Sequence, residues 1–415
     1  MRSKHSEVST GVLSNGIRVV HTLWRGSAVA IFGVTVKAGS RNESQNEHGL
    51  AHFVEHTIFK GTGHRRACHI INRMEAVGGE LNAFTTKEET VIYSVFPSGN
   101  LVRAVELIAD LVSDSRFPEH ELAKEREVVA DEIDSYLDSP SEAIFDDFED
   151  YIFSGSPLGH NILGTTESLK NFDSATCRDF IERNYTTGNM VAFYSGPRSA
   201  NVVFSQMERY LSAVAIRKRD NISQEITPKI NASFDRTHML ATHQTHCIIG
   251  TRVPSYLDDR RYATALLANI MGGPGMNSLL NVALRERRGL VYNVEVSTAL
   301  FSDCGIMTVY FGCDPSDTER CREIVFHEFD CLETTLTPKR LDAAKRQYLG
   351  QLVIASENRE NSALGMARSL LWRNEMIEPS VTESAIYSLT IDDVIEAAKP
   401  MMNPSMMTFS PESAN

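Results

Sequence analysis

The chain of 415 residues shows one order of secondary structure twice, on either side of a charged segment near its middle. Residues 215–235 lose the apolar periodicity of their surroundings, which is typical of an interdomain linker. Each flanking half reads as strand, helix, strand and helix, although the halves share too little identity to establish a duplication from sequence alone. Because a length of about 100–200 residues per domain also fits two domains, we predict a first domain over 1–215, a linker over 216–235 and a second domain over 236–415.

Local patterns place the elements within each half. β-Branched and apolar runs predict strands at residues 17–21, 28–37, 78–87, 90–96, 190–195, 246–253, 291–299 and 305–312. Helical spacing predicts helices over residues 48–60, 99–115, 118–138, parts of 140–185, 259–271 and a further segment to about 287, and again after the strand at 305–312 to the end. The fold class expected is therefore α+β.

Composition narrows the class of protein. Hydrophobic residues make up 42% and charged residues 23%, as in globular proteins with a core. A net charge of −13 argues against a nucleic-acid partner. The seven cysteines have irregular spacing, and no apolar run is long enough to span a membrane or to act as a leader. We expect a soluble, cytoplasmic protein with free thiols.

The predicted helix over residues 48–60 carries His52, Glu55 and His56. A spacing of four places both imidazoles on one helix face, with about 5–6 Å between their Cβ atoms, and Glu55 lies on the neighbouring stripe. This H-x-x-E-H order is a zinc-peptidase pattern, in which the histidines bind Zn²⁺ and the carboxylate accepts a proton from water. Chance clustering on an amphipathic helix remains the alternative for the motif alone.

A catalytic zinc ion usually has a third protein ligand. On the helix predicted over residues 118–138, Glu125 and Glu132 lie two turns apart, at the edge of an apolar stripe that begins with Leu122. Carboxylates in that position need a partner. Two partners fit the pattern equally, a metal ion or a salt bridge at the edge of the stripe.

The sequence as a whole resembles the pitrilysin/insulinase family of zinc metallopeptidases, especially its processing-peptidase branch and bacterial single-chain members. The resemblance is carried by HGLAHFVEHTIFKGT (48–62), GGELNAFTTKEETVIY (78–93), EREVVADEIDSYLDSP (125–140), MGGPGMNSLL (271–280) and LRERRGLVY (284–292). It implies two similar α/β-sandwich domains that face each other like a clam shell. One departure stands out: Leu279 replaces an arginine that family members often carry.

The resemblance implies a role for each matching residue. His52, His56 and Glu132 match the ligands of one zinc ion per chain, and Glu55 matches the general base. Glu125 matches a second carboxylate that supports the site. Other matches are to the substrate-pairing strand (Asn82, Ala83, Phe84), to a pair in the second domain that completes the site (Arg285, Tyr292), and to acids that bind an arginine two residues before the cut (Glu142, Asp146).

These matches predict a zinc metalloendopeptidase that cleaves peptides or presequence-like substrates and favours a basic residue near the scissile bond. A solvated acidic surface is the other interpretation of Glu142 and Asp146. A non-catalytic partner subunit of a processing-peptidase-like complex is the alternative function, although the intact motif argues against it. A homodimer is expected by analogy. His64 and His69, near the motif, are either spare ligands or surface residues.

Overall fold

The computed structural model describes residues 6–212, 214, 229 and 231–412, so most of the expected linker lies outside the described residues. The chain divides into two compact units. The first contains residues 6–134, 160–212 and 356–377, and the second contains residues 135–159, 231–355 and 378–412. Segments 135–159 and 356–377 therefore each belong to the unit of the other sequence half, unlike in the contiguous division expected from the sequence.

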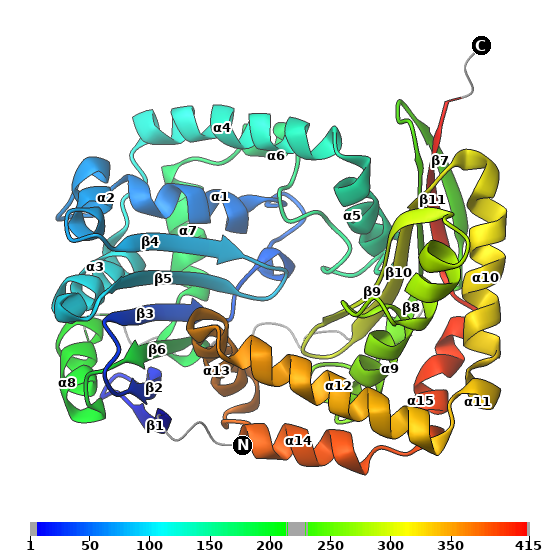
Figure 1. Cartoon of the computed structure of the whole chain (residues 1–415). Coiled ribbons are helices and arrows are strands. Elements are labelled where there is room, and N and C mark those ends of the chain that lie inside the picture. Colours follow the sequence, from blue (N-terminus) through cyan, green and yellow to red (C-terminus); the bar gives the residue numbers. More distant parts are fainter. Residues whose placement is uncertain (1–5, 213, 215–228, 230, 413–415) are drawn as a thin grey trace. The chain divides into compact units, whose positions relative to one another are not determined.

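The first unit is built on a six-stranded sheet with the order β1-β2-β6-β3-β5-β4 (Figure 1). Its strands are β1 (Ser6–Val12), β2 (Arg18–Trp24), β3 (Val29–Val36), β4 (Glu80–Thr85), β5 (Thr90–Pro97) and β6 (Met190–Gly196). Its helices are α1 (Leu50–Thr57), α2 (Ala67–Glu75), α3 (Leu101–Asp114), most of α4 (Glu119–Leu137), α6 (Thr166–Leu169), α7 (Ser174–Asn184), α8 (Ala200–Leu211) and α13 (Arg359–Arg373). The strands β3 and β5 are buried along nearly their whole length, which fits their places inside a sheet that is covered on both faces.

The second unit is built on a five-stranded sheet with the order β7-β11-β8-β10-β9. Its strands are β7 (Asp235–Leu240), β8 (Thr245–Val253), β9 (Val291–Leu300), β10 (Gly305–Cys313) and β11 (Ser405–Pro411). Its helices are α5 (Pro140–Ile152), α9 (Arg261–Gly272), the π-helix η5 (Asn281–Glu286), α10 (Thr318–Asp330), α11 (Leu332–Thr335), nearly all of α12 (Pro338–Ser356), α14 (Pro379–Ser388) and α15 (Ile391–Ala398). The expectation of helices to the end of the chain is wrong, because the last described element is the strand β11.

The two sheets have the same topology. Without β1, the order β2-β6-β3-β5-β4 corresponds strand for strand to β7-β11-β8-β10-β9. In each sheet the first two of these strands pair in parallel and the remaining pairs are antiparallel. This repeat confirms two similar sheet-containing α/β units. How the two units face each other stays a prediction.

The long helices of the two units correspond as well. Four residues separate Leu122 from Arg126 in α4, and four separate Leu341 from Lys345 in α12. Both leucines are buried. Arg126 donates a hydrogen bond to the Phe172 carbonyl, two residues before α7, and Lys345 donates one to the Leu389 carbonyl, two residues before α15. The shared register aligns α4 with α12 residue by residue.

Each sheet is covered by helices on both faces. In the first unit, α3 packs on one face, and α13 packs on β2, β3 and β6. In the second unit, α9 packs against β9 and α5 packs against β8 and β11, with Phe148 fully buried. Within the described residues, every helix is too short or too polar to cross a membrane.

Candidate metal centre

The helix α1 is fixed at its N-terminus by a buried carboxylate. Gly49 precedes the helix with φ +96, a conformation that favours glycine. The Glu43 carboxylate accepts hydrogen bonds from the backbone N–H groups of Gly49 and Ala51, at 2.9 and 2.7 Å. Since the first N–H groups of a helix lack partners within the helix, Glu43 satisfies two of them. On α1 itself, Phe53 and Val54 are completely buried, which sets the rotation of the helix.

The helix α4 presents the two glutamates on the stripe that its sequence pattern predicts. Leu122, Val129 and Ile133 are buried and attach the helix to the core. Glu125 is buried with them, at 8% exposure, whereas the side chain of Glu132 is 44% exposed. Glu125 therefore needs a polar partner inside the protein, and Glu132 stands where the interior meets solvent.

The structure brings His52, His56 and Glu132 together from these two helices. One possible ligand atom of each lies within 4.8 Å of the other two. His56 Nε2 is 3.3 Å from Glu132 Oε2, and His52 Nε2 is 3.8 Å from Glu132 Oε1. Two imidazole nitrogens and one carboxylate oxygen are a ligand set that catalytic zinc sites use, so the donor chemistry fits zinc.

Glu125 contacts the second nitrogen of one of these histidines. Its Oε2 is 3.5 Å from His56 Nδ1, and its Oε1 is 2.6 Å from the Nζ of Lys60. A carboxylate on the far nitrogen of a metal-ligating histidine fixes the orientation of the ring and makes it a better donor. Lys60, which the sequence analysis did not single out, compensates the buried charge of Glu125. Lys60 follows α1 directly, in the turn η2 (Ile58–Lys60).

The pKa values of two side chains on α1 suit metal binding by His52 and proton transfer by Glu55. Burial, and to a smaller extent the charge of His56, lowers the pKa of His52 to about 4, so the ring is neutral near pH 7. A neutral imidazole is the form that binds metal. Burial raises the pKa of Glu55, and Thr85 and His56 partly oppose this shift. A carboxylate with a raised pKa is a stronger base than an ordinary glutamate.

The strand β4 lies at the free edge of its sheet, next to α1. It pairs only with β5 in the six-stranded sheet, and α1 packs against it. Asn82, Ala83 and Phe84 are all partly exposed on this strand. The unpaired N–H and C=O groups of an edge strand can pair with an extended peptide. Thr85, at the end of β4, lies beside Glu55, so the edge runs toward the three ligands.

The remaining predicted site residues belong to the second unit. Arg285 lies in η5 with a side chain that is 46% exposed, and Tyr292 lies on the edge strand β9 with 85% exposure. Glu142 and Asp146 lie four residues apart on α5, so the helix that their shared face requires is present. Burial and, to a smaller extent, Asp146 raise the pKa of Tyr136, and Tyr136 also donates a hydrogen bond to the Glu142 backbone carbonyl.

A second group of metal-ligating side chains lies elsewhere in the first unit. His64, Asp110 and Asp114 have ligand atoms within 4.8 Å of one another. Asp110 already accepts hydrogen bonds from Thr62 and from Arg65, at 2.7 and 2.6 Å. The guanidinium supplies the positive charge that a cation would otherwise provide, so this group is an ion-paired cluster at the surface.

Two family models, both of peptidase family M16, match most of the chain. Residues 19–166 match the family described as insulinase (peptidase family M16), and residues 171–348 match the family described as peptidase M16 inactive domain. A protein of Streptomyces coelicolor named uncharacterized zinc protease is 31% identical over 96% of this chain and 88% of its own. One of the same description from Mycobacterium tuberculosis is 32% identical over 94% and 90%.

Two solved structures share the fold. A structure titled peptidase M16 inactive domain, from Pseudomonas fluorescens, superposes with a TM-score of 0.91 at 18% identity and covers 99% of both chains. A protease from Helicobacter pylori superposes with a TM-score of 0.89 at 20% identity, over 98% of this chain and 100% of its own. The family matches, the relatives and the fold agree, and the chain belongs to the insulinase family of peptidases, family M16.

Proposed function

We propose that the chain is a zinc-dependent metalloendopeptidase that cleaves extended peptides bound along the free edge of β4. The observation that carries this proposal is the convergence of His52, His56 and Glu132 beside Glu55 and an open strand edge. The names of the relatives, which call them zinc proteases, support the same metal and the same class of reaction.

In this proposal His52, His56 and Glu132 hold one zinc ion per chain, and Glu125 keeps the His56 ring in position. Zinc, when bound, acts as a Lewis acid that makes water more acidic and polarises a carbonyl group. Glu55 accepts the proton of the attacking water and later delivers it to the leaving amine. The N–H and C=O groups of residues 82–84 pair with the substrate backbone and hold it extended.

The second unit supplies substrate contacts in the proposal. Arg285 and Tyr292 donate hydrogen bonds to the substrate carbonyl as negative charge develops on its oxygen. Both side chains are exposed, and Arg285 lies 3.8 Å from the equally exposed Glu286. Glu142 and Asp146 bind an arginine two residues before the cut, because two carboxylates on one helix face match a guanidinium. The negative charge of the whole chain adds long-range attraction for basic peptides, which salt would weaken.

The test of the reaction is the variant Glu55→Gln, with Glu127→Gln as matched control. Gln cannot accept the proton but has nearly the same shape, so we expect kcat to fall by about 10²–10⁴-fold while zinc content is retained. Glu127 lies on the exposed face of α4, and its replacement should change neither quantity.

Both quantities are measured on the same samples, by hydrolysis of a peptide library and by atomic absorption after dialysis. Near-normal kcat in Glu55→Gln would rule out the assigned base. Zinc-loaded wild-type protein that cleaves no peptide would favour the alternative, a non-catalytic partner subunit.

A further inference from the structure

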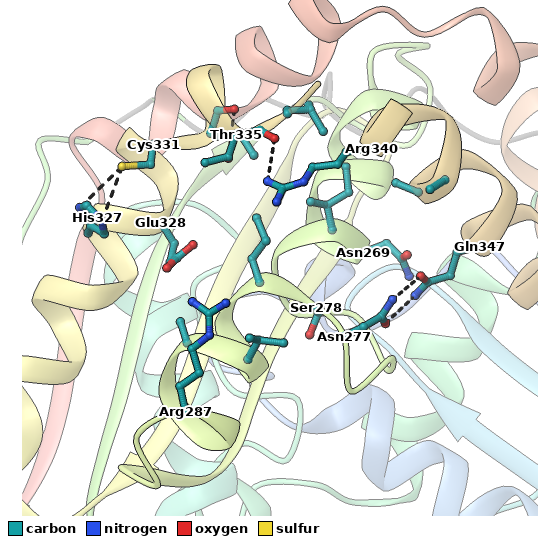
Figure 2. A pocket seen from close by; sticks show the side chains of 18 residues that line it. Asn269, Asn277, Ser278, Arg287, His327, Glu328, Cys331, Thr335, Arg340 and Gln347 are labelled. Atoms are coloured by element: carbon teal, nitrogen blue, oxygen red, sulfur yellow. Dashed lines mark hydrogen bonds between the residues drawn. The ribbon is translucent and has the colours of Figure 1, made fainter. Parts of the chain in front are cut away.

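The second unit contains a cavity of about 510 Å³ that shares no residue with the candidate metal centre. The end of α9, the segment before η5, and the helices η5, α10, α11 and α12 form its walls (Figure 2). Leu279 and Leu336 are among its apolar lining residues. The volume lies in the range of sites that bind small molecules, about 300–1,000 Å³.

The correspondence between α4 and α12 gives a physical reason for the open space. Glu125 of α4 corresponds to Ala344 of α12, because each lies three residues after its buried leucine. In the first unit the long Glu125 side chain forms an ion pair with Lys60 beside the helix. In the second unit Ala344 lines the cavity instead. The loss of the carboxylate removes volume as well as a charged group.

Several polar groups on the cavity wall lack partners among the residues that the structure describes. Ser278 is 5% exposed, and its buried hydroxyl has no hydrogen-bond partner. Arg287 is exposed and Glu328 is half-buried, and neither has an ion-pair partner among the described residues. Figure 2 shows the guanidinium and the carboxylate pointing toward the same part of the cavity. Arg340 donates one hydrogen bond, to the Thr335 carbonyl at 2.8 Å, and has no carboxylate partner in the described part of the chain.

We propose that this cavity binds a short peptide with apolar side chains through its two charged ends. The peptide carboxylate matches the guanidinium groups of Arg287 and Arg340, which bind carboxylates in a two-point geometry. The peptide ammonium matches Glu328, a peptide backbone group satisfies Ser278, and an apolar side chain packs against Leu279 and Leu336. A ligand with both charges thus pairs with the two exposed arginines and the half-buried Glu328, and it satisfies the buried hydroxyl of Ser278.

The first experiment varies the ligand and leaves the cavity unchanged. Leucyl-leucine, its N-acetyl form, its C-terminal amide and the doubly capped form are titrated calorimetrically into the full-length, zinc-loaded Glu55→Gln protein, so that hydrolysis does not interfere. We expect leucyl-leucine to bind tightest, and each cap to weaken binding about tenfold or more. Equal binding of all four would overturn the proposal, and so would no binding of leucyl-leucine. If only the N-acetyl form bound as tightly as leucyl-leucine, the ligand class would be a simple carboxylate and the peptide assignment would be wrong.

The second experiment locates the site. Arg340→Gln and Glu328→Gln should each weaken leucyl-leucine binding about tenfold, and N-acetylation should cost nothing further in Glu328→Gln. The matched controls are Arg346→Gln on α12 and Glu323→Gln on α10, both exposed and outside the cavity lining. If the cavity variants bind like their controls, the peptide binds elsewhere and the proposal fails. This outcome is independent of whether Glu55 is the catalytic base, because hydrolysis is not measured.

Discussion

The pair of helices α1 and α4 in the first unit and the pair α9 and α12 in the second unit occupy corresponding places in two sheets of the same topology. The first pair brings two histidines and a glutamate together. The second pair cannot, since α9 contains no histidine, cysteine, aspartate or glutamate. In the register of α12, Gln351 stands in place of Glu132. It accepts a hydrogen bond from Asn269 at 2.6 Å, so that a neutral amide pair lies there.

The same fold thus holds both helix pairs in place, and a few side chains determine whether a pair can bind a metal ion. At the positions of α12 that correspond to Glu132 and Glu125 of α4 stand Gln351 and Ala344. The second helix pair therefore lacks both carboxylates, although the two sheets have the same strand order. The description of one matching family as an inactive domain fits this interpretation of residues 171–348 only in part, because that match also covers the end of the first unit. The three candidate ligands all lie in the first compact unit.

The largest effect should come from removing a ligand on the first helix pair. Glu132→Gln leaves zinc with two histidines, so we expect zinc affinity to fall more than 100-fold, beyond the 10–100-fold cost of altering a supporting residue. Activity should disappear with the metal. Atomic absorption after dialysis against a graded chelator measures the loss, with Glu127→Gln as control. Equal zinc content in the two variants would remove Glu132 from the ligand set.

A smaller effect should follow from changing the second unit. Arg285→Ala or Tyr292→Phe should lower kcat/KM by about 10²-fold, as for the loss of one donor to a developing oxyanion. Zinc content should stay unchanged, because neither residue belongs to the unit that holds the metal centre. Steady-state kinetics and metal analysis on the same preparations test this. Unchanged kcat/KM in both variants would confine the catalytic groups to the first unit.

Specificity should change less than rate. In wild type, a peptide with arginine two residues before the cut should be cleaved about tenfold better than its norleucine counterpart. The double variant Glu142→Gln/Asp146→Asn should lose that preference and keep the kcat of the norleucine peptide. Competition between the paired peptides gives the ratio directly. If the double variant keeps the preference, or if wild type lacks it, Glu142 and Asp146 do not bind the substrate arginine and only form a solvated acidic surface.

The smallest effect should come from restoring a carboxylate in the second helix pair. Gln351→Glu supplies the counterpart of Glu132, but α9 offers no imidazole to complete a site. We therefore expect the zinc stoichiometry to remain one per chain. Peptide hydrolysis should stay within about twofold of wild type, because the change lies outside the unit that holds the candidate metal centre and the glutamate can still accept the hydrogen bond from Asn269. A second equivalent of tightly bound zinc would show that the two helix pairs differ less than their sequences suggest.

The local parts of the site were predictable from the sequence. Helical periodicity and Gly61 define the ligand-bearing segment, which the structure forms as α1 followed by η2. The wheel positions of Glu125 and Glu127 on α4 predict one carboxylate at the apolar stripe and one in solvent, and the structure confirms both. These features depend on residues within a few turns of each other, where spacing determines which side chains share a face.

The long-range parts were not predictable. The apolar faces of α5 and α13 show that each helix is buried, but not that each covers the sheet of the other sequence half. The sequence pattern does not predict β7, because the side chains of this strand are mostly exposed and the strand begins at the end of the charged segment. It forms by pairing in parallel with β11, far along the chain. The contact of Lys60 with Glu125 likewise depends on how two helices pack together.

Anomalous X-ray diffraction at the zinc absorption edge, on crystals of the zinc-loaded protein, locates the metal directly. We expect one strong peak per chain, within about 2.0–2.2 Å of nitrogens of His52 and His56 and of a carboxylate oxygen of Glu132. A peak at His64, Asp110 and Asp114 instead, a peak of similar strength at Asn269 and Gln351, or no peak in zinc-loaded crystals would contradict this expectation.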